Sequence, residues 1–288
     1  VDCIKNIIKI KNGKVPVWNK NPYQHEIEQL TQDNIFVEMP AELVLSATKI
    51  ISYETCPLQY KFKEVDKIPS LDKKKYFQLG SIIHKILEEF HKQKMNSKDE
   101  ILSLLEKYWI DEDFEYIQEQ KQYKIDANNM LENYFNYFKK NPKHPDYIEE
   151  SFSFKLKNCT INGKCDRIDL LKNGQVEIYD YKTSKKKKSS KEMKNDYQLI
   201  VYALFLIHEG IAIKGKDKLK IVPEKLALLS LRHEDIEESI KFELDELIDK
   251  KNDIEKIAED IRENKFSSNV GHHCEYCEFK DLICPEFN

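Results

Sequence analysis

Apolar residues recur with helical spacing in the first half of the chain. The clearest stretch covers residues 77–91, where large apolar side chains fall every three or four positions along one helix face. Similar spacing predicts helices at about 98–108 and 126–138. A shorter helix is expected to begin at Ser46, whose hydroxyl can cap a helix N-terminus, and to end near Cys56.

The spacing changes to every second residue beyond Pro145, which indicates β-strands. Three strands are predicted at 151–156, 160–171 and 176–181. Two Asn-Gly pairs have the composition of tight turns, and the second of them would join two of these strands as a hairpin. The pairs are Asn162-Gly163 and Asn173-Gly174.

The later sequence adds a helix at about 191–208, an apolar strand at 226–231 and a long polar helix at 235–264. The predicted order is a helical part, three antiparallel strands, a helix and a further strand. That order is typical of an α/β fold, in which helices flank a mixed sheet.

Residues 1–45 carry short strand-like pieces at 7–10 and 15–18, separated by polar segments that contain proline. We interpret them as a connecting arm that precedes one folded domain at 46–288. The sequence begins at Val1 rather than at a methionine, so we expect it to be a piece of a longer protein.

Composition and charge narrow the function only slightly. The mean hydropathy of -0.66 and the lack of a long apolar run argue against a membrane span or a secretory leader, so a cytoplasmic location is expected. A net charge of -4 gives no support to nucleic-acid binding by the molecule as a whole. Basic residues do cluster after one predicted strand, where a solvated loop and a phosphate contact are both reasonable interpretations. They are Lys185, Lys186, Lys187, Lys188, Lys191 and Lys194.

Two carboxylates and a lysine are expected to converge on the predicted hairpin. Because side chains alternate along a strand, Asp180 and Lys182 should point to the same face. Asp166 lies across the Asn173-Gly174 turn, and antiparallel pairing would bring its carboxylate close to that of Asp180. Mg²⁺ or Mn²⁺ takes such oxygen ligands and activates bound water, while a neighbouring lysine stabilises developing negative charge. The grouping therefore predicts metal-dependent phosphodiester hydrolysis.

Four motifs follow one another in the order found in a known nuclease family. Their sequences are Gly-Ser-Ile-Ile-His, Gly-Lys-Cys-Asp-Arg-Ile-Asp, Asp-Tyr-Lys-Thr-Ser and Gln-Leu-Ile-Val-Tyr-Ala, at residues 80–84, 163–169, 180–184 and 198–203. Over residues 45–285 the chain resembles the RecB-like nucleases of the PD-(D/E)XK superfamily. The resemblance implies a restriction-endonuclease-like α/β core at about 146–232. It also implies a helical insertion at about 77–140 and a C-terminal helix and cysteine-stapled segment at 235–288.

The resemblance assigns a role to each matching residue of the first three motifs. The metal ligands would be His84, Asp166 and Asp180, and Lys182 would be the catalytic lysine. Each of these residues taken alone has an ordinary structural explanation, because an Asp-x-Lys sequence or a helix histidine is common. The four ordered motifs together favour the functional interpretation.

Other polar residues near these motifs receive assignments of the same kind. By the resemblance, Gln198 and Tyr202 would line the site and orient the substrate phosphate, since residues four apart share a helix face. Asp169 lies three positions along a strand from the first aspartate, so it should face the other way and serve a structural role. An outer metal ligand could come from the preceding strand, at Glu149 or Glu150.

Seven cysteines in a chain without a secretory leader favour metal ligation over disulfides. Cys274 and Cys277 have the spacing that places two thiolates on one metal, and Cys284 follows closely. AddB-type nucleases carry a similar split set, and the resemblance implies a [4Fe-4S] cluster held by Cys56, Cys274, Cys277 and Cys284. His272 and His273 precede the set, which leaves a Zn²⁺ site as the alternative. The other three cysteines are interpreted as ordinary thiols.

These observations predict a metal-dependent DNA nuclease, and the resemblance implies an exonuclease that acts on single strands or duplex ends in recombination and repair. Relatives of this kind are fused to, or paired with, a superfamily I helicase. The resemblance therefore implies such a partner, and ATP hydrolysis is expected to come from elsewhere because the sequence has no Gly-rich phosphate loop. Two alternatives stay open. One is a non-catalytic, metal-stapled scaffold that binds DNA or a helicase, and the other is a zinc-dependent binding module in which Asp180-Tyr181-Lys182 is accidental.

Overall fold

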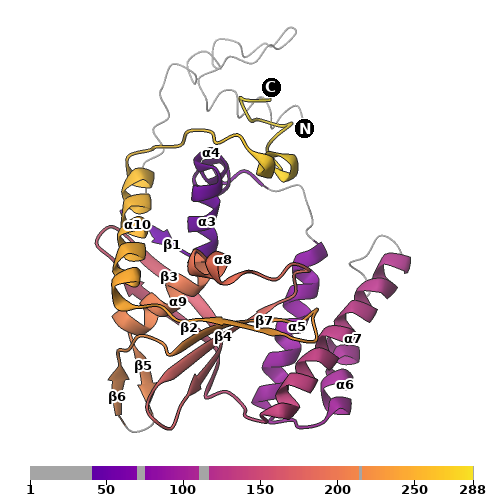
Figure 1. The fold of residues 1–288 in the computed structure, drawn as a ribbon. Helices are drawn as coiled ribbons and strands as arrows, with labels where there is room; N and C mark the ends of the chain where they lie inside the picture. Colours follow the sequence, from indigo (N-terminus) through magenta and orange to yellow (C-terminus); the bar gives the residue numbers. More distant parts are fainter. Residues whose placement is uncertain (1–40, 70–74, 110–116, 214–215, 288) are drawn as a thin grey trace, which may run out of the picture. The chain divides into compact units, whose positions relative to one another are not determined.

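The structure is a computed structural model that describes residues 41–69, 75–109, 117–213 and 216–287 (Figure 1). The strand-like pieces expected at 7–10 and 15–18 lie outside the described residues.

The chain divides into two compact units. We call residues 1–43, 49–72 and 257–288 the cysteine unit, and residues 44–48 and 73–256 the sheet unit. The division falls within helices α3 (Ala47–Thr55) and α10 (Leu244–Arg262). The single domain expected at 46–288 therefore includes parts of both units.

The sheet unit is built around a mixed sheet with the strand order β1–β3–β4–β7–β8, in which β2 also pairs with β3. Neighbouring strands are antiparallel except for β1 with β3 and β4 with β7, which are parallel. The strands are β1 (Val44–Leu45), β2 (Tyr147–Lys155), β3 (Thr160–Leu170), β4 (Val176–Lys182), β7 (Lys225–Ser230) and β8 (Glu237–Ile240). The predicted α/β class and its three antiparallel strands are confirmed.

Helices cover the sheet on both sides (Figure 1). Three of them, α5 (Lys75–Lys92), α6 (Lys98–Tyr108) and α7 (Ile117–Lys140), share one apolar cluster with Tyr179 and Tyr181 of β4. The intervening residue of β4, Asp180, bonds to Tyr202 of α9 (Tyr197–His208). Because side chains alternate along a strand, α9 lies on the opposite face of β4 from α7.

The cysteine unit has its own short elements. After α3 come α4 (Pro57–Tyr60) and a π-helical turn (Lys61–Val65), and a 3₁₀ turn (His272–Tyr276) lies near the chain end. A small apolar cluster of Phe62, Phe279 and Ile283 joins these segments.

The Asn162-Gly163 pair forms no turn, contrary to the sequence prediction, because both residues lie inside β3. A Cβ atom at position 163 would lie 2.3 Å from the Cζ atom of Phe152, the residue directly opposite on β2. The Phe152 ring is itself stacked on Phe205 of α9, with ring centroids 4.5 Å apart. Glycine is therefore required here by a neighbouring ring. At the second pair a turn is confirmed, since Gly174 has φ = 82° and its amide donates to the Leu171 carbonyl.

Several predicted boundaries were wrong. The helix expected at 191–208 is two helices, α8 (Ser190–Lys194) and α9, because Asp196 interrupts it and caps α9 by accepting a hydrogen bond from the Gln198 amide at 3.0 Å. The first residues of the polar helix expected at 235–264 form the edge strand β8, and α10 follows. The hairpin of β5 (Ile211–Ile213) and β6 (Lys216–Leu219) was not predicted. Val44 and Leu45, assigned to the arm, form β1 and pair with β3.

The contact between Gly163 and Phe152 predicts a specific coupling in stability. We expect Gly163→Ala to lower the free energy of unfolding by about 1–3 kcal/mol, because the added methyl group overlaps a ring that is held by its own neighbours. Replacing that ring with the smaller side chain in Phe152→Leu should reduce the loss of unfolding free energy caused by Gly163→Ala. Denaturant unfolding of the two single variants and the double variant measures this coupling energy.

Gly174→Ala is the matched control, because its Cβ would meet no atom within 4 Å and only the positive φ opposes it. Its cost of about 1 kcal/mol should be the same in the wild-type background and in the Phe152→Leu background. Equal coupling at both glycines would contradict the steric explanation.

Candidate active site and cysteine pocket

Asp180 and Lys182 lie two residues apart on β4, in the middle of the sheet. The Asp180 side chain is buried, with 1% exposed, and the Lys182 Nζ atom lies 2.6 Å from its Oδ2 atom. Burial opposes the Lys182 ammonium, but the Asp180 carboxylate outweighs it and holds the pKa of Lys182 above its usual value. The predicted shared face for this pair is therefore present, and the two groups form a buried ion pair.

Asp166 lies on β3, where the backbone ladder between β3 and β4 ends. The last paired residues of that ladder are Arg167 and Tyr179. Beyond them, Asp166 Oδ2 accepts a hydrogen bond from the backbone amide of Tyr181 at 2.8 Å. The carboxylate thus replaces a strand-to-strand hydrogen bond, which fixes its position beside the Asp180–Lys182 pair.

His84 reaches the same place from α5. Its Nε2 atom lies 3.0 Å from the carbonyl oxygen of Tyr181, and since a carbonyl only accepts, Nε2 carries the hydrogen and donates. The other ring nitrogen, Nδ1, faces carboxylates, at 3.5 Å from Asp166 Oδ1 and 3.9 Å from Glu149 Oε1. Burial disfavours a charged ring, but the bonds to these two carboxylates outweigh it and raise the pKa of His84 to about 10.

Glu149 of β2 completes a group with His84 and Asp166, in which one ligand atom from each lies within 4.8 Å of the others. Glu149 has φ = 53°, a left-handed backbone that is unusual for a residue other than glycine. Its second oxygen is 2.5 Å from Lys164 Nζ. Burial opposes the charged form, but His84 and Lys164 outweigh it and lower the pKa of Glu149. The sequence offered two adjacent glutamates here and gave no means of choosing between them.

Gln198 and Tyr202 of α9 contact the acidic residue on β4. Asp180 Oδ1 accepts hydrogen bonds from Gln198 Nε2 at 2.6 Å and from the Tyr202 hydroxyl at 3.0 Å. Gln198 also accepts a bond from Lys182 Nζ at 2.5 Å through its Oε1 atom. One amide therefore orients both members of the buried ion pair, whereas the sequence interpretation placed these two residues against substrate phosphate.

The donor set suits a hard divalent cation. His84, Glu149 and Asp166 offer one nitrogen and two carboxylate oxygens in a single group. Asp180 Oδ2 is buried and lies 2.6 Å from the ammonium of Lys182. A buried carboxylate oxygen next to this group can serve as a further ligand atom for a cation.

The basic stretch after β4 is largely engaged within the protein. Lys186 pairs with Glu192 at 2.7 Å, and Lys188 pairs with the buried Asp196 at 2.6 Å. Lys187 pairs with Glu238, and Lys194 pairs with Glu246 at 2.5 Å. These contacts tie the segment to β8, α9 and α10, so it is an anchored loop; a phosphate contact there stays a prediction. Asp169 forms a two-point ion pair with Arg167, as its structural interpretation requires.

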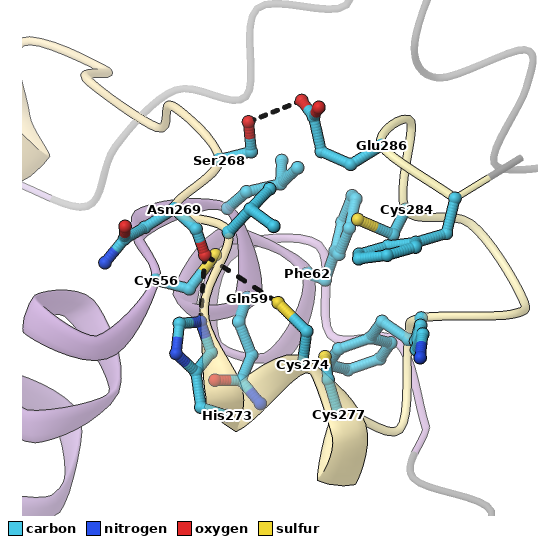
Figure 2. A pocket seen from close by; sticks show the side chains of 15 residues that line it. Cys56, Gln59, Phe62, Ser268, Asn269, His273, Cys274, Cys277, Cys284 and Glu286 are labelled. Atoms are coloured by element: carbon cyan, nitrogen blue, oxygen red, sulfur yellow. Dashed lines mark hydrogen bonds between the residues drawn. The ribbon is translucent and has the colours of Figure 1, made fainter.

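In the cysteine unit, the four cysteines predicted as ligands line one pocket (Figure 2). Cys56 is the N-cap of α4, Cys274 lies in the 3₁₀ turn, Cys277 ends that turn, and Cys284 follows near the chain end. Burial, with a smaller contribution from the neighbouring cysteines, raises the pKa of Cys277 and of Cys284. Thiols in such surroundings become thiolates only when a cation compensates their charge.

The two histidines beside this pocket differ in position. His273 lines the pocket, and its Nε2 atom donates to the Asn269 carbonyl at 2.8 Å (Figure 2). His272 has a side chain that is 82% exposed, and its ring faces Glu275 at 3.3 Å.

Comparison with known proteins gives one family match. The sequence model of the PD-(D/E)XK nuclease superfamily matches residues 44–285. A search of curated proteins finds no significant match. No helix in the described part of the chain is long and apolar enough to cross a bilayer.

Two of the solved structures that match this chain share little sequence with it. One is the crystal structure of SSO0001, with 18% identity, a TM-score of 0.40, and coverage of 87% of this chain and 89% of the other. Another is a protein from Eubacterium rectale that is provisionally named an exonuclease. It has 13% identity, a TM-score of 0.49, and coverage of 88% of this chain and 93% of its own.

The group around His84 predicts which glutamate contributes to cation binding. We expect Glu149→Gln to weaken Mn²⁺ binding by roughly tenfold, about 1.4 kcal/mol, because one charged oxygen is lost from the group. Glu150→Gln is the matched control, since Glu150 is adjacent in sequence but outside the group. Isothermal titration of the whole chain with Mn²⁺ measures both. Equal weakening by the two substitutions would contradict a specific role for Glu149.

Proposed function

The chain belongs to the PD-(D/E)XK nuclease superfamily, and we propose that it is a divalent-metal-dependent DNA nuclease that hydrolyses phosphodiester bonds. The observation that carries the proposal is the meeting of His84, Glu149 and Asp166 beside the buried Asp180–Lys182 pair. Phosphodiester hydrolysis needs a cation site and a neighbouring positive charge, and this corner of the sheet offers both.

The contacts of each residue in the candidate active site suggest its role. His84, Glu149, Asp166 and Asp180 would hold Mg²⁺ or Mn²⁺. When bound, the ion supplies Lewis-acid stabilisation of the phosphoryl oxygens and a more acidic water. The Lys182 ammonium lies next to the proposed ion-binding residues. There it would orient the attacking water and stabilise negative charge as the phosphate reacts.

Gln198 and Tyr202 act by holding this machinery in place. Gln198 bonds to Lys182 and to Asp180 together, so it limits the rotation of the lysine side chain and of the carboxylate. Tyr202 donates to the same Asp180 oxygen. By the family resemblance, both residues would also orient a phosphate bound at this site.

The finer biological assignment rests on the four ordered sequence motifs. They support a RecB-like exonuclease that acts at single strands or duplex ends during recombination and repair. Because the sequence has no Gly-rich phosphate loop, we propose that unwinding is supplied by a superfamily I helicase, in the same chain or as a subunit.

The proposal includes a [4Fe-4S] cluster bound by Cys56, Cys274, Cys277 and Cys284. Its support is that these four side chains line one pocket whose walls include Leu58, Phe62 and Phe279. Soft thiolates in an apolar setting are the usual ligands of iron–sulfur clusters. A Zn²⁺ site that used His273 would bind the ion through Nδ1, because Nε2 donates to the Asn269 carbonyl.

Cleavage assays test the nuclease assignment. With Mg²⁺ or Mn²⁺, the chain should degrade end-labelled linear DNA, spare closed circular DNA if it is an exonuclease, and be inactive in EDTA. Asp180→Asn and Lys182→Met should each reduce cleavage by at least about a hundredfold, because the first removes a candidate ligand charge and the second removes the ammonium paired with it. Lys256→Met, at an exposed residue of α10, serves as the surface control and should cleave normally.

Two outcomes would overturn this assignment. Full activity in a folded Asp180→Asn protein would remove the site. An inactive wild-type chain that still binds Mn²⁺ and DNA would favour the non-catalytic scaffold.

Metal analysis tests the cluster. Protein purified without oxygen should be brown and contain about four irons per chain, as a cubane cluster with four cysteine ligands requires. Cys56→Ala should lose the iron and fall in thermal stability, whereas Cys159→Ala, at a buried cysteine outside the pocket, should keep its iron. Colourless protein with one zinc per chain would replace the cluster with the zinc alternative.

A further inference from the structure

A series of hydrogen bonds connects Asn96 at the surface to Tyr134 behind the candidate active site. The donor and acceptor roles along the series are set by Asn96. The side-chain amide of Asn96 donates through Nδ2 to the Lys94 carbonyl at 2.8 Å, so its Oδ1 atom is the one that faces His144. His144 Nε2 must therefore donate to that oxygen, at 3.3 Å. In a neutral His144 ring the other nitrogen, Nδ1, then accepts.

The roles at His144 determine which ring nitrogen donates in His91. His144 Nδ1 lies 2.9 Å from His91 Nδ1, so His91 donates here and its Nε2 atom becomes an acceptor. Burial, and then the charge of Arg167, lowers the pKa of His91 to about 2, so this ring is neutral. The hydroxyl of Tyr134 contacts His91 Nε2 and must donate to it.

Tyr134 connects this chain to both acidic strands. With its hydrogen given to His91, its oxygen can only accept, and it has two donors: Arg167 Nη1 at 3.3 Å and the Tyr181 hydroxyl at 3.4 Å. Arg167 follows Asp166 on β3, and Tyr181 stands between Asp180 and Lys182 on β4. A single buried hydroxyl therefore bonds to the neighbours of both candidate aspartates.

The position of this link matters because the strands part here. Arg167 and Tyr179 are the last residues of the β3–β4 ladder. Beyond them, the backbone of Tyr181 holds two of the candidate ligands, since its amide donates to Asp166 and its carbonyl accepts from His84. Any shift of Tyr181 would displace both groups together.

We propose that Tyr134 is a positioning residue for the cation site, acting through Arg167 and Tyr181 to fix the separation of β3 and β4 where their backbone pairing ends. This inference rests on the proposed function for the existence of the site. It adds a residue on α7 that touches neither substrate nor cation.

The test compares two tyrosines one turn apart on α7. Tyr134→Phe removes the linking hydroxyl, while the control, Tyr137→Phe, removes a hydroxyl that donates to Glu237 at 2.5 Å. With Mn²⁺ alone as the probe, we expect Tyr134→Phe to weaken binding by roughly threefold to tenfold, near the lower end of effects from groups behind a metal ligand. Tyr137→Phe should bind Mn²⁺ like the wild type.

The readouts separate positioning from general loosening. Circular dichroism and thermal unfolding report the fold, and cleavage measured at saturating Mn²⁺ should recover much of the activity lost at low Mn²⁺. If Tyr134→Phe does not fold, Tyr181→Phe removes the other end of the same bond and should show the same weakening.

Unchanged Mn²⁺ affinity in a folded Tyr134→Phe protein, or equal weakening by Tyr137→Phe, would overturn the proposal while leaving the cation site intact. A wild-type chain that binds no Mn²⁺ would remove both the site and its positioning residue. Weakening confined to the Tyr134 and Tyr181 variants supports it.

Discussion

The burial of two carboxylates in the middle of a sheet is the constraint on which the rest of the sheet unit depends. A charge moved out of water is costly unless hydrogen bonds and an opposite charge compensate it. Asp180 is compensated by Lys182 and by two side chains from α9, and Asp166 by the amide of Tyr181 and by His84. These partners come from α5, α9 and β4, so the packing of these three elements is fixed by the same requirement.

Because side chains alternate along β4, the two faces of the strand carry different kinds of residue. Asp180 and Lys182 lie on the face that packs against α9 and carries the candidate site, whereas Tyr179 and Tyr181 are buried against α5 and α7. The Arg167 guanidinium, on the same side of the sheet as α7, is also buried. It stacks on Tyr179 and is paired with Asp169. The polar layer behind the site therefore satisfies its own hydrogen bonds, which keeps the backbone between the two faces from shifting.

Much of this arrangement could be predicted from local sequence, and the errors have a common cause. The shared face of Asp180 and Lys182 follows from the two-residue period of a strand, and the helix of His84 follows from its apolar spacing. Gly163 was mistaken for a turn residue because the reason for glycine is the Phe152 ring on another strand. Strand β8 was mistaken for helix because an edge strand with one buried residue in four, Ile240, has no clear alternation.

The choice between Glu149 and Glu150 was also beyond the sequence, because it depends on which side chain lies near His84 and Asp166 in the folded chain. The break before α9 is different, since Ser189 and Asp196 are recognisable caps and could have been read as such.

The two candidate inorganic sites have to be separate because their donor chemistries are opposed. Oxygen and imidazole donors near the sheet suit a hard ion that takes part in phosphate chemistry, while a pocket of four cysteines suits soft metal centres. The cysteine set also joins distant parts of the sequence, since residues 73–256 of the sheet unit lie between Cys56 and Cys274. A bond across so long a loop restricts the unfolded chain strongly, and metal binding to the folded pocket adds directly to its stability. In the proposed function, a metal centre bound by the cysteines would contribute to the fold, and the acidic site would carry the hydrolysis.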